Sequence, residues 1–233
     1  NFSKLDGSFE LEKMYIAKFD EYYLYGYIDA IREYDDEISI IDWKSSSKFV
    51  SSKLSSAGRQ LIVYKLGLEQ TGLKIDKVMW NMLKYCYVCH VQKNKKIKRK
   101  MVNRGKLIKE MRTAFTKLML NNNINECKIE VILDKAEKDS DFDSLPQCVK
   151  DEYWLEDCLL EYEVTDEKVE EVQSYIINTI KEIESKDKDD ESQWQPLNID
   201  KENFYCNTLC GHRSTCKYLS QWKKENPFKK IGF

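Results

Sequence analysis

Three ionisable side chains interrupt segments whose composition otherwise indicates apolar β-strands. Asp29 lies in Gly-Tyr-Ile-Asp-Ala-Ile, and Asp42 lies in Ile-Ile-Asp-Trp-Lys, with Lys44 two residues later. Strand residues two apart project to the same face, so Asp42 and Lys44 are expected to point together. If the two strands pair through the polar turn at 35–37, Asp29 comes alongside Asp42.

Two neighbouring carboxylates in buried strands need a compensating charge, because burying each one costs several kcal/mol. A divalent cation supplies that charge, and oxygen-only ligands suit Mg²⁺ or Mn²⁺, which also bind substrate phosphates. Lys44 would then assist the attacking water or stabilise the developing negative charge. By residue types alone, the alternative is an Asp–Lys ion pair at a sheet edge.

Gln60 and Tyr64 follow the Asp-x-Lys strand in a segment whose apolar residues have helical spacing. Four residues apart, they share one helix face. They could orient Lys44 or hydrogen-bond a DNA backbone. Alone, a Gln-x-x-x-Tyr pair is a weak signal that is usually an ordinary helix surface.

In order and spacing, these motifs resemble the RecB-like branch of the PD-(D/E)xK nuclease superfamily, and phage-encoded and CRISPR-adaptation nucleases are similar. The motifs cover about residues 9–70. The resemblance implies that two acids bind Mg²⁺ or Mn²⁺, often with the backbone carbonyl of Trp43, and that a lysine is catalytic. It maps the catalytic and substrate-binding roles onto Asp29, Asp42, Lys44, Gln60 and Tyr64.

The sequence departs from that family at one ligand. Family members often carry an upstream His or Glu as a further metal ligand, but His90 and His212 both lie downstream of the motifs. Glu10 is the expected substitute, with Glu12 as its alternative. The ligand could also precede Asn1, or both glutamates could be ordinary exposed strand carboxylates.

Cys206, Cys210 and Cys216 form a compact group near the C-terminus. Three cysteines within eleven residues indicate a metal or iron–sulfur site that staples the tail to the core. Several RecB-like nucleases, including the AddB type, carry an iron–sulfur cluster on a C-terminal C-x₂-C-x₅-C run. The tail resembles that run with one extra residue in the first gap, which implies a [4Fe–4S] cluster.

Zn²⁺ is the alternative at this group, with His212 completing a Cys₃His site, and three free thiols are a third possibility. The fourth cluster ligand could precede Asn1 or be Cys86 or Cys89. The segment from Cys86 to His90 spells a haem-attachment string, but a strand of buried thiols is the simpler interpretation. Three further cysteines are expected in the core: Cys127, Cys148 and Cys158.

Charge is unevenly distributed, although the net charge is only −2. The segment from Lys93 to Lys109 holds nine Lys or Arg and no acid, whereas acids dominate residues 151–191. Each run could be a solvated face. We expect DNA contacts in the basic run, at Lys95, Lys96, Lys98 and Arg99.

Aromatic residues are abundant, with 14 Tyr and 5 Trp, and most should lie in the core. Tyr22, Tyr23, Tyr25 and Tyr27 stand close to Asp29 in sequence. They could include a base-stacking surface for single strands, although core packing accounts for them more simply.

The fold class expected is α/β (α+β), with an antiparallel meander followed by a strand–helix–strand parallel crossover. The resemblance implies a restriction-endonuclease-like mixed central sheet flanked by helices, with a Cys-rich C-terminal staple. Expected strands are 10–18, 22–34, 38–44, 75–91 (one or two strands) and 128–133. Expected helices are one through Gln60 ending near 71–72, then 104–120, a short piece opened by Pro146 around Tyr153, and 165–184. Expected irregular segments are a Ser-rich linker at 45–56, a break at 121–125 and a loose stretch at 186–195.

Taken together, these features predict a nuclease core at 1–200 and a Cys-rich segment at 201–233. The expected activity is metal-dependent hydrolysis of DNA at duplex ends or on single strands, as in phage-type recombination or repair. The alternative is a non-catalytic iron–sulfur or zinc DNA-binding module. A helicase, recombinase or annealing protein could be a partner. The sequence has no apolar run of membrane-spanning length and no export signal, so we expect a cytoplasmic protein (host cytoplasm if phage-encoded).

Overall fold

The computed structural model describes residues 5–46 and 51–227, with side chains described from residue 54 onward in the second range. The chain forms two compact units that divide between Ile176 and Ile177. Each unit is described by itself. None of the helices in the described part is both long enough and apolar enough to cross a membrane.

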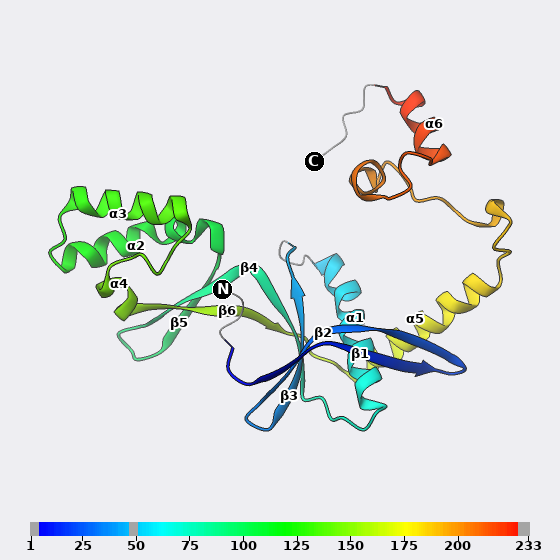
Figure 1. The fold of residues 1–233 in the computed structure, drawn as a ribbon, viewed down its shortest axis with the longest axis horizontal. Helices are drawn as coiled ribbons and strands as arrows, with labels where there is room; N and C mark the ends of the chain where they lie inside the picture. Colours follow the sequence, from blue (N-terminus) through cyan, green and yellow to red (C-terminus); the bar gives the residue numbers. More distant parts are fainter. Residues whose placement is uncertain (1–4, 47–50, 228–233) are drawn as a thin grey trace. The chain divides into compact units, whose positions relative to one another are not determined.

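The first unit is built on one mixed sheet (Figure 1), which confirms the expected mixed α/β architecture. The first three strands form an antiparallel meander, the third pairs in parallel with the fourth, and the fifth and sixth both pair antiparallel with the fourth. The strands are β1 (Ser8–Phe19), β2 (Tyr22–Tyr34), β3 (Glu37–Lys44), β4 (Lys77–Val91), β5 (Ile97–Asn103) and β6 (Tyr153–Glu161).

The meander and the crossover follow from local sequence signals. β3 is rich in β-branched residues, which favour strands, and the turn before it places Asp35 and Asp36 at positive φ, a conformation that aspartate tolerates. The parallel register runs from Ser39 opposite Lys77 to Lys44 opposite Met82. It confirms the predicted crossover.

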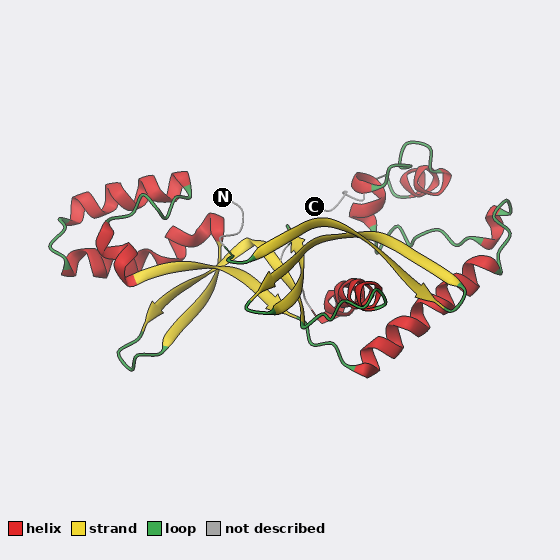
Figure 2. Ribbon diagram, turned by 60° about the horizontal axis from the view of Figure 1, so that its bottom comes forward, coloured by secondary structure: helices red, strands yellow, loops and turns green. Residues whose placement is uncertain are grey.

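Helix α1 (Ser51–Glu69) makes that crossover and packs against β1, β3 and β4. In Figure 2 the β1–β2 hairpin curves over this helix. Gly67 permits the close approach, because a Cβ there would lie 2.6 Å from Cδ2 of the Tyr15 ring. The Ser-rich linker predicted at 45–56 is therefore wrong from Ser51 onward, where the serines open a helix; residues 47–50 lie outside the described part.

The strand predicted at 128–133 is wrong, because that segment belongs to the helix α3 (Glu126–Asp139). Its apolar residues recur at helical spacing and pack against α2 (Leu107–Asn121). The side-chain oxygen of Asn125 caps the helix by accepting the N–H of Cys127. The buried residues of α3 are Ile129, Leu133 and Ala136.

Two strands were missing from the sequence expectations. β5 lies inside the basic run, where charged side chains conceal an exposed edge strand. Pro146 does open a short helix, α4 (Gln147–Glu152), but Tyr153 begins β6 instead of lying within that helix. β6 is recognisable only through its partner, because it is mostly half-buried and pairs along β4.

Helix α5 (Asp166–Glu184) confirms the predicted cap, since Oγ1 of Thr165 accepts the N–H of Lys168 at 3.4 Å. The second unit contains short turns η2 (Glu191–Gln193) and η3 (Tyr205–Leu209) and helix α6 (Lys217–Glu225). The division between units falls within α5. The boundary expected between a nuclease core at 1–200 and a Cys-rich segment at 201–233 stays a prediction.

The tyrosines of β2 are not core residues. Tyr23, Tyr25 and Tyr27 are all exposed, while Tyr22 is half-buried. The expectation that core packing explains them is wrong for these three, because strand alternation turns every second side chain of β2 away from α1.

Candidate functional site

Asp42 and Lys44 lie at the end of β3 and point together, as predicted. Nζ of Lys44 is 2.5 Å from Oδ2 of Asp42, whose side chain is only 2% exposed. Both residues lie on a central strand of the sheet, because β3 is flanked by β2 and β4. The site therefore contains a buried carboxylate whose charge is balanced by one amine.

Asp29 joins them where the ladder between β2 and β3 ends. The last paired residues are Ala30 and Ile41, so the next position along each strand is Asp29 on β2 and Asp42 on β3. Oδ2 of Asp29 accepts the backbone N–H of Trp43 at 2.8 Å. Asp29 thus replaces a missing strand hydrogen bond, and its carboxylate is held beside Asp42.

Helix α1 contributes Gln60 and Tyr64 to the same site. Nζ of Lys44 donates to Oε1 of Gln60 at 2.9 Å, and Nε2 of Gln60 donates to the hydroxyl oxygen of Tyr64 at 2.6 Å. The Tyr64 ring packs edge-on against Tyr15, with centroids 5.2 Å apart. The predicted helix face therefore reaches Lys44 and orients its amine through a chain of hydrogen bonds.

Burial controls the ionisation of this site. Burial raises the pKa of Asp42, and the hydrogen bond and charge of Lys44 oppose that shift, while the nearby Asp29 carboxylate adds to it. Burial and the charge of Asp42 raise the pKa of Tyr64 to about 12. Tyr64 is therefore a neutral hydroxyl at physiological pH.

The donor set suits a hard divalent cation. Asp29 and Asp42 offer carboxylate oxygens beside the Trp43 backbone, and the single Lys44 ammonium balances only one of their two negative charges. In the described residues, no group of three or more His, Cys, Asp or Glu is arranged to hold a metal ion. Two carboxylates still fit Mg²⁺, which is often held by one or two carboxylates, waters and substrate phosphates.

The proposed upstream ligands lie on β1. Glu10 pairs with Ile31, is exposed, and forms an ion pair with Lys13 at 2.7 Å. Glu12 occupies the position across from Asp29, between two regular strand pairs, and has a φ of 51°. Register thus puts Glu12 closer to Asp29 than Glu10, and the role of Glu10 stays a prediction.

The basic residues expected to contact DNA are on the β4–β5 hairpin. Lys95 and Lys96 lie in its turn and Lys98 on β5, all exposed. Arg99 differs from them, because its guanidinium donates to both carboxylate oxygens of Glu156 on β6, at 2.7 and 3.3 Å. The Arg99 guanidinium is thus occupied by its ion pair with Glu156, and the three lysines are the better candidates for phosphate contacts.

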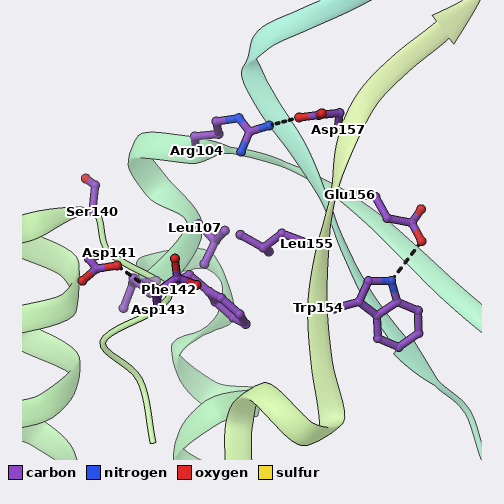
Figure 3. Close-up of a pocket in the computed structure, with 11 residues that line it drawn as sticks. Arg104, Leu107, Ser140, Asp141, Phe142, Asp143, Trp154, Leu155, Glu156 and Asp157 are labelled. Atoms are coloured by element: carbon purple, nitrogen blue, oxygen red, sulfur yellow. Dashed lines mark hydrogen bonds and ion pairs between the residues drawn. The ribbon is translucent and has the colours of Figure 1, made fainter. Parts of the chain in front are cut away.

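The first unit also contains a cavity of about 420 Å³ that no sequence motif indicated (Figure 3). It lies among the start of α2, the loop after α3 and β6. Arg104 donates to Asp157 at 2.7 Å on one side, and the Trp154 indole donates to Glu156 at 2.9 Å on another. The Arg104–Asp157 pair joins β6 to the turn before α2, whereas the Trp154–Glu156 bond lies within β6.

In the second unit, Cys206, Cys210 and Cys216 all line one cavity of about 300 Å³. Burial raises the pKa of Cys206, and the other two thiols add to the shift, as expected for neighbouring sulfurs. Sγ of Cys216 accepts the backbone N–H of Leu219 at 3.4 Å. His212 is exposed and does not line this cavity.

Cys86 and Cys89 are buried on β4, as the strand interpretation predicted. Burial raises the pKa of each thiol to about 11, so both are protonated at neutral pH. Cys158 is buried and Cys148 is half-buried against the α2–α3 core, but Cys127 is exposed on α3. Placing Cys127 in the core was wrong because its segment is a helix whose other face is buried.

Sequence reasoning missed Arg59, which is adjacent to Gln60 on α1. Its guanidinium lies 4.1 Å from the centroid of the Tyr175 ring on α5. Both residues line a cavity of about 290 Å³ together with Tyr27, Gln60 and Tyr64. A basic residue directly before the Gln-x-x-x-Tyr motif was the available signal.

Comparison with known families agrees with this geometry. The family model described as the PD-(D/E)XK nuclease superfamily matches residues 3–217. No curated protein and no solved structure matches the chain. Because the family match begins before β1 and extends through the sheet to the start of α6, the chain belongs to the PD-(D/E)XK nuclease superfamily.

Proposed function

We propose that the protein is a Mg²⁺- or Mn²⁺-dependent deoxyribonuclease that hydrolyses phosphodiester bonds at a centre formed by Asp29, Asp42 and Lys44. The observation that carries the proposal is the position of the Lys44 amine. It lies between a buried carboxylate and the side chain of Gln60, at 2.5 and 2.9 Å. A purely structural ion pair at a sheet edge would not need a second, uncharged partner on a separate helix.

The chain's own residues have distinct roles in this proposal. Asp29 and Asp42 would hold Mg²⁺ or Mn²⁺, with the Trp43 carbonyl as a further oxygen donor. When bound, the ion supplies positive charge to the phosphate and makes a water molecule a stronger nucleophile. Lys44 stabilises the negative charge that develops on the phosphate oxygens as the P–O bond breaks.

Gln60 and Tyr64 act as positioning residues. The Gln60 carbonyl fixes the Lys44 amine, and the neutral Tyr64 hydroxyl fixes the Gln60 amide by accepting its N–H. These contacts would keep the Lys44 amine in the site when the Asp42 carboxylate binds the metal ion. Water adds across the P–O bond, which leaves a phosphate monoester on one fragment and a hydroxyl group on the other.

The finer features follow the RecB-like resemblance. We propose that the enzyme acts on single strands or duplex ends, as an exonuclease of phage-type recombination or repair. A helicase, recombinase or annealing protein would present its substrate. The grouping of Cys206, Cys210 and Cys216 around one cavity supports a [4Fe–4S] cluster in the tail, with Zn²⁺ as the alternative.

Cleavage of a fluorescent oligonucleotide in Mg²⁺ or Mn²⁺ tests the proposed activity, with EDTA as the metal-free reference. Asp42→Ala and Lys44→Ala should each reduce cleavage at least about 100-fold, as removal of charge-stabilising groups does elsewhere. Glu33→Gln and Lys84→Ala, at exposed strand positions, are the matched controls and should cleave normally. Full Mg²⁺-dependent activity in both site variants would refute the assignment, and binding without cleavage by the wild type would favour a non-catalytic module.

A further inference from the structure

The outer face of the β1–β2 hairpin exposes aromatic residues at every second position of β2. Tyr23, Tyr25 and Tyr27 are 64%, 72% and 62% exposed. The strand register sets an exposed β1 residue beside each tyrosine. We call this surface the tyrosine ladder, and it consists of the cross-strand pairs Lys18–Tyr23, Ile16–Tyr25 and Met14–Tyr27.

The opposite face of the hairpin is filled by the core. Tyr15, Ala17 and Phe19 alternate with the ladder residues of β1 and are all buried. Helix α1 covers that side, and the Tyr15 ring lies directly on Gly67. Tyr23 and Tyr25 are therefore not needed for packing on α1. The Lys18 ammonium lies 5.8 Å from the centroid of the Tyr23 ring, Tyr25 is the most exposed of the three rings, and Tyr27 also lines the cavity beside α1.

The spacing of the ladder suits a strand of unpaired bases. Strand residues rise about 3.3 Å each, so alternate tyrosines are roughly 6.6 Å apart along β2. This is about twice the 3.4 Å rise per nucleotide of one strand in B-form DNA, which matches bases that have been drawn apart. Aromatic side chains bind such bases without sequence preference, because every base has a π-face.

The ladder is continuous with the proposed catalytic site. Tyr27 precedes Asp29 by two residues on β2. It also lines the 290 Å³ cavity to which Gln60 and Tyr64 contribute, and those two residues connect through hydrogen bonds to Lys44. A strand lying along the ladder would thus be led toward the residues that act on the phosphate.

Arg59 lies at this junction. Its guanidinium stacks on the Tyr175 ring at 4.1 Å, which holds the cation in place at the cavity wall. An arginine fixed in this way is well suited to contact a backbone phosphate, because the guanidinium presents several donors in one plane. The cavity therefore combines an aromatic entrance with a positive charge.

We propose that the tyrosine ladder is a base-stacking platform that guides a single-stranded nucleic acid past Arg59 to the catalytic acids. The inference rests on the proposed nuclease function and names the form of its substrate. The turn next to the ladder carries Asp20 and Glu21, so charge alone does not draw a phosphate backbone to this surface. Stacking supplies the attraction along the ladder, and Arg59 supplies it at the cavity.

Fluorescence anisotropy with a labelled single-stranded DNA 20-mer tests the platform directly. EDTA suppresses cleavage, so the binding measurement does not depend on activity. Tyr25→Ala and Tyr27→Ala should each weaken binding roughly 5- to 100-fold, the usual effect of losing one stacking residue. Tyr25→Phe should bind like the wild type, because stacking needs the ring and not the hydroxyl. Tyr34→Ala, an exposed tyrosine of the same strand outside the ladder, is the matched control and should also bind normally.

A strand of the same length with abasic sites separates stacking from phosphate contacts. The wild type should prefer the base-bearing strand, and Tyr25→Ala should lose that preference. Arg59→Ala should weaken binding of both strands by a similar factor. Unchanged binding in both tyrosine variants overturns the platform, as does an equal loss on base-bearing and abasic DNA.

A rival occupant would be a second copy of the chain, which Met14 and Ile16 could attract. Sedimentation of the wild type and of Tyr25→Ala decides this: a dimer that the substitution dissociates overturns the proposal, and a monomer in both supports it. If the wild type shows no cleavage in Mn²⁺, the nuclease function itself is contradicted instead. The two failures are thus distinguishable.

Discussion

The carboxyl of Asp42 shows how far residue types alone could predict the site. An acid inside an apolar strand and a lysine two positions later were enough to predict that Asp42 and Lys44 share a face, because strand periodicity fixes it. The bond from the Trp43 N–H to Asp29 could not be predicted. It depends on the β2–β3 ladder ending at Ala30 and Ile41, a register that only the folded sheet determines.

The raised pKa of Asp42 predicts opposite pH trends for activity and for stability. Cleavage requires the ionised carboxylate, so activity should fall on acidification, because protons compete with the metal ion for the Asp42 oxygens. The pKa is higher in the folded than in the unfolded chain. This group therefore stabilises the metal-free fold below the unfolded pKa, and the stabilisation is lost as pH rises through the folded pKa.

Denaturant titrations of metal-free protein across this pH range measure the stability trend. Asp42→Asn should remove this contribution, whereas Glu33→Gln, at an exposed strand position, should keep it. The account is wrong if Asp42→Asn has the same pH dependence of unfolding free energy as the wild type.

At the element scale, the sequence predicted elements whose own pattern was strong. The three-strand meander and α5 follow from β-branched runs and a Thr165 cap. The strand expected at 128–133 is a helix instead, because its few apolar residues fit both periods and only the contact with α2 selects one. β5 was missed because its charged residues resemble a solvated run, and β6 was missed because it pairs with β4, which lies far away from it in sequence.

The packing of α1 beneath the hairpin makes a prediction for Gly67. Alanine is intrinsically better than glycine in a helix by about 1 kcal/mol. Its Cβ would lie 2.6 Å from the Tyr15 ring and 3.4 Å from Ala17 Cβ. We therefore expect Gly67→Ala to lower the unfolding free energy by about 1–2 kcal/mol, as overpacking typically does. Ser55→Ala, on an exposed position of α1, is the control, and a stabilised Gly67→Ala would contradict this packing.

The β4–β5 hairpin makes a prediction about duplex binding. Lys98 pairs with His90, and Asp42 pairs with Trp80, so the two sites lie roughly 30 Å apart along β4. We expect Lys95→Ala, Lys96→Ala and Lys98→Ala together to weaken duplex binding and to reduce the salt slope by about 0.9 for each lost phosphate contact. Arg99→Ala should change the slope little because Glu156 holds that side chain. If the triple variant and the wild type show the same salt slope of duplex binding, the hairpin does not contact the DNA.

At the scale of the whole molecule, the match to the PD-(D/E)XK superfamily covers residues 3–217, although the motifs that suggested it cover only about residues 9–70. These motifs therefore predicted the superfamily, whereas the helices α2, α3 and α4 lie outside them, between β5 and β6. The second unit has a small cavity lined by Cys206, Cys210 and Cys216, and a metal or iron–sulfur site at these cysteines stays a prediction.

Anaerobic purification tests the proposed cluster in that second unit. A [4Fe–4S] centre should give broad absorbance near the middle of the violet and about four iron atoms per chain. Cys206→Ser should lose both signals, and Cys127→Ser, at an exposed thiol of the first unit, should keep them. A colourless protein that contains zinc would contradict the iron–sulfur cluster and support the zinc site.

Binding of Mn²⁺ in the absence of DNA, measured by calorimetry on three proteins, tests the central claim most directly. Asp42→Asn should lose the site, because it removes a carboxylate ligand. Lys44→Ala should bind Mn²⁺ at least as tightly as the wild type, since its ammonium no longer competes for Oδ2 of Asp42, yet it should fail to cleave DNA. Wild-type affinity in Asp42→Asn together with normal cleavage by Lys44→Ala would contradict the account.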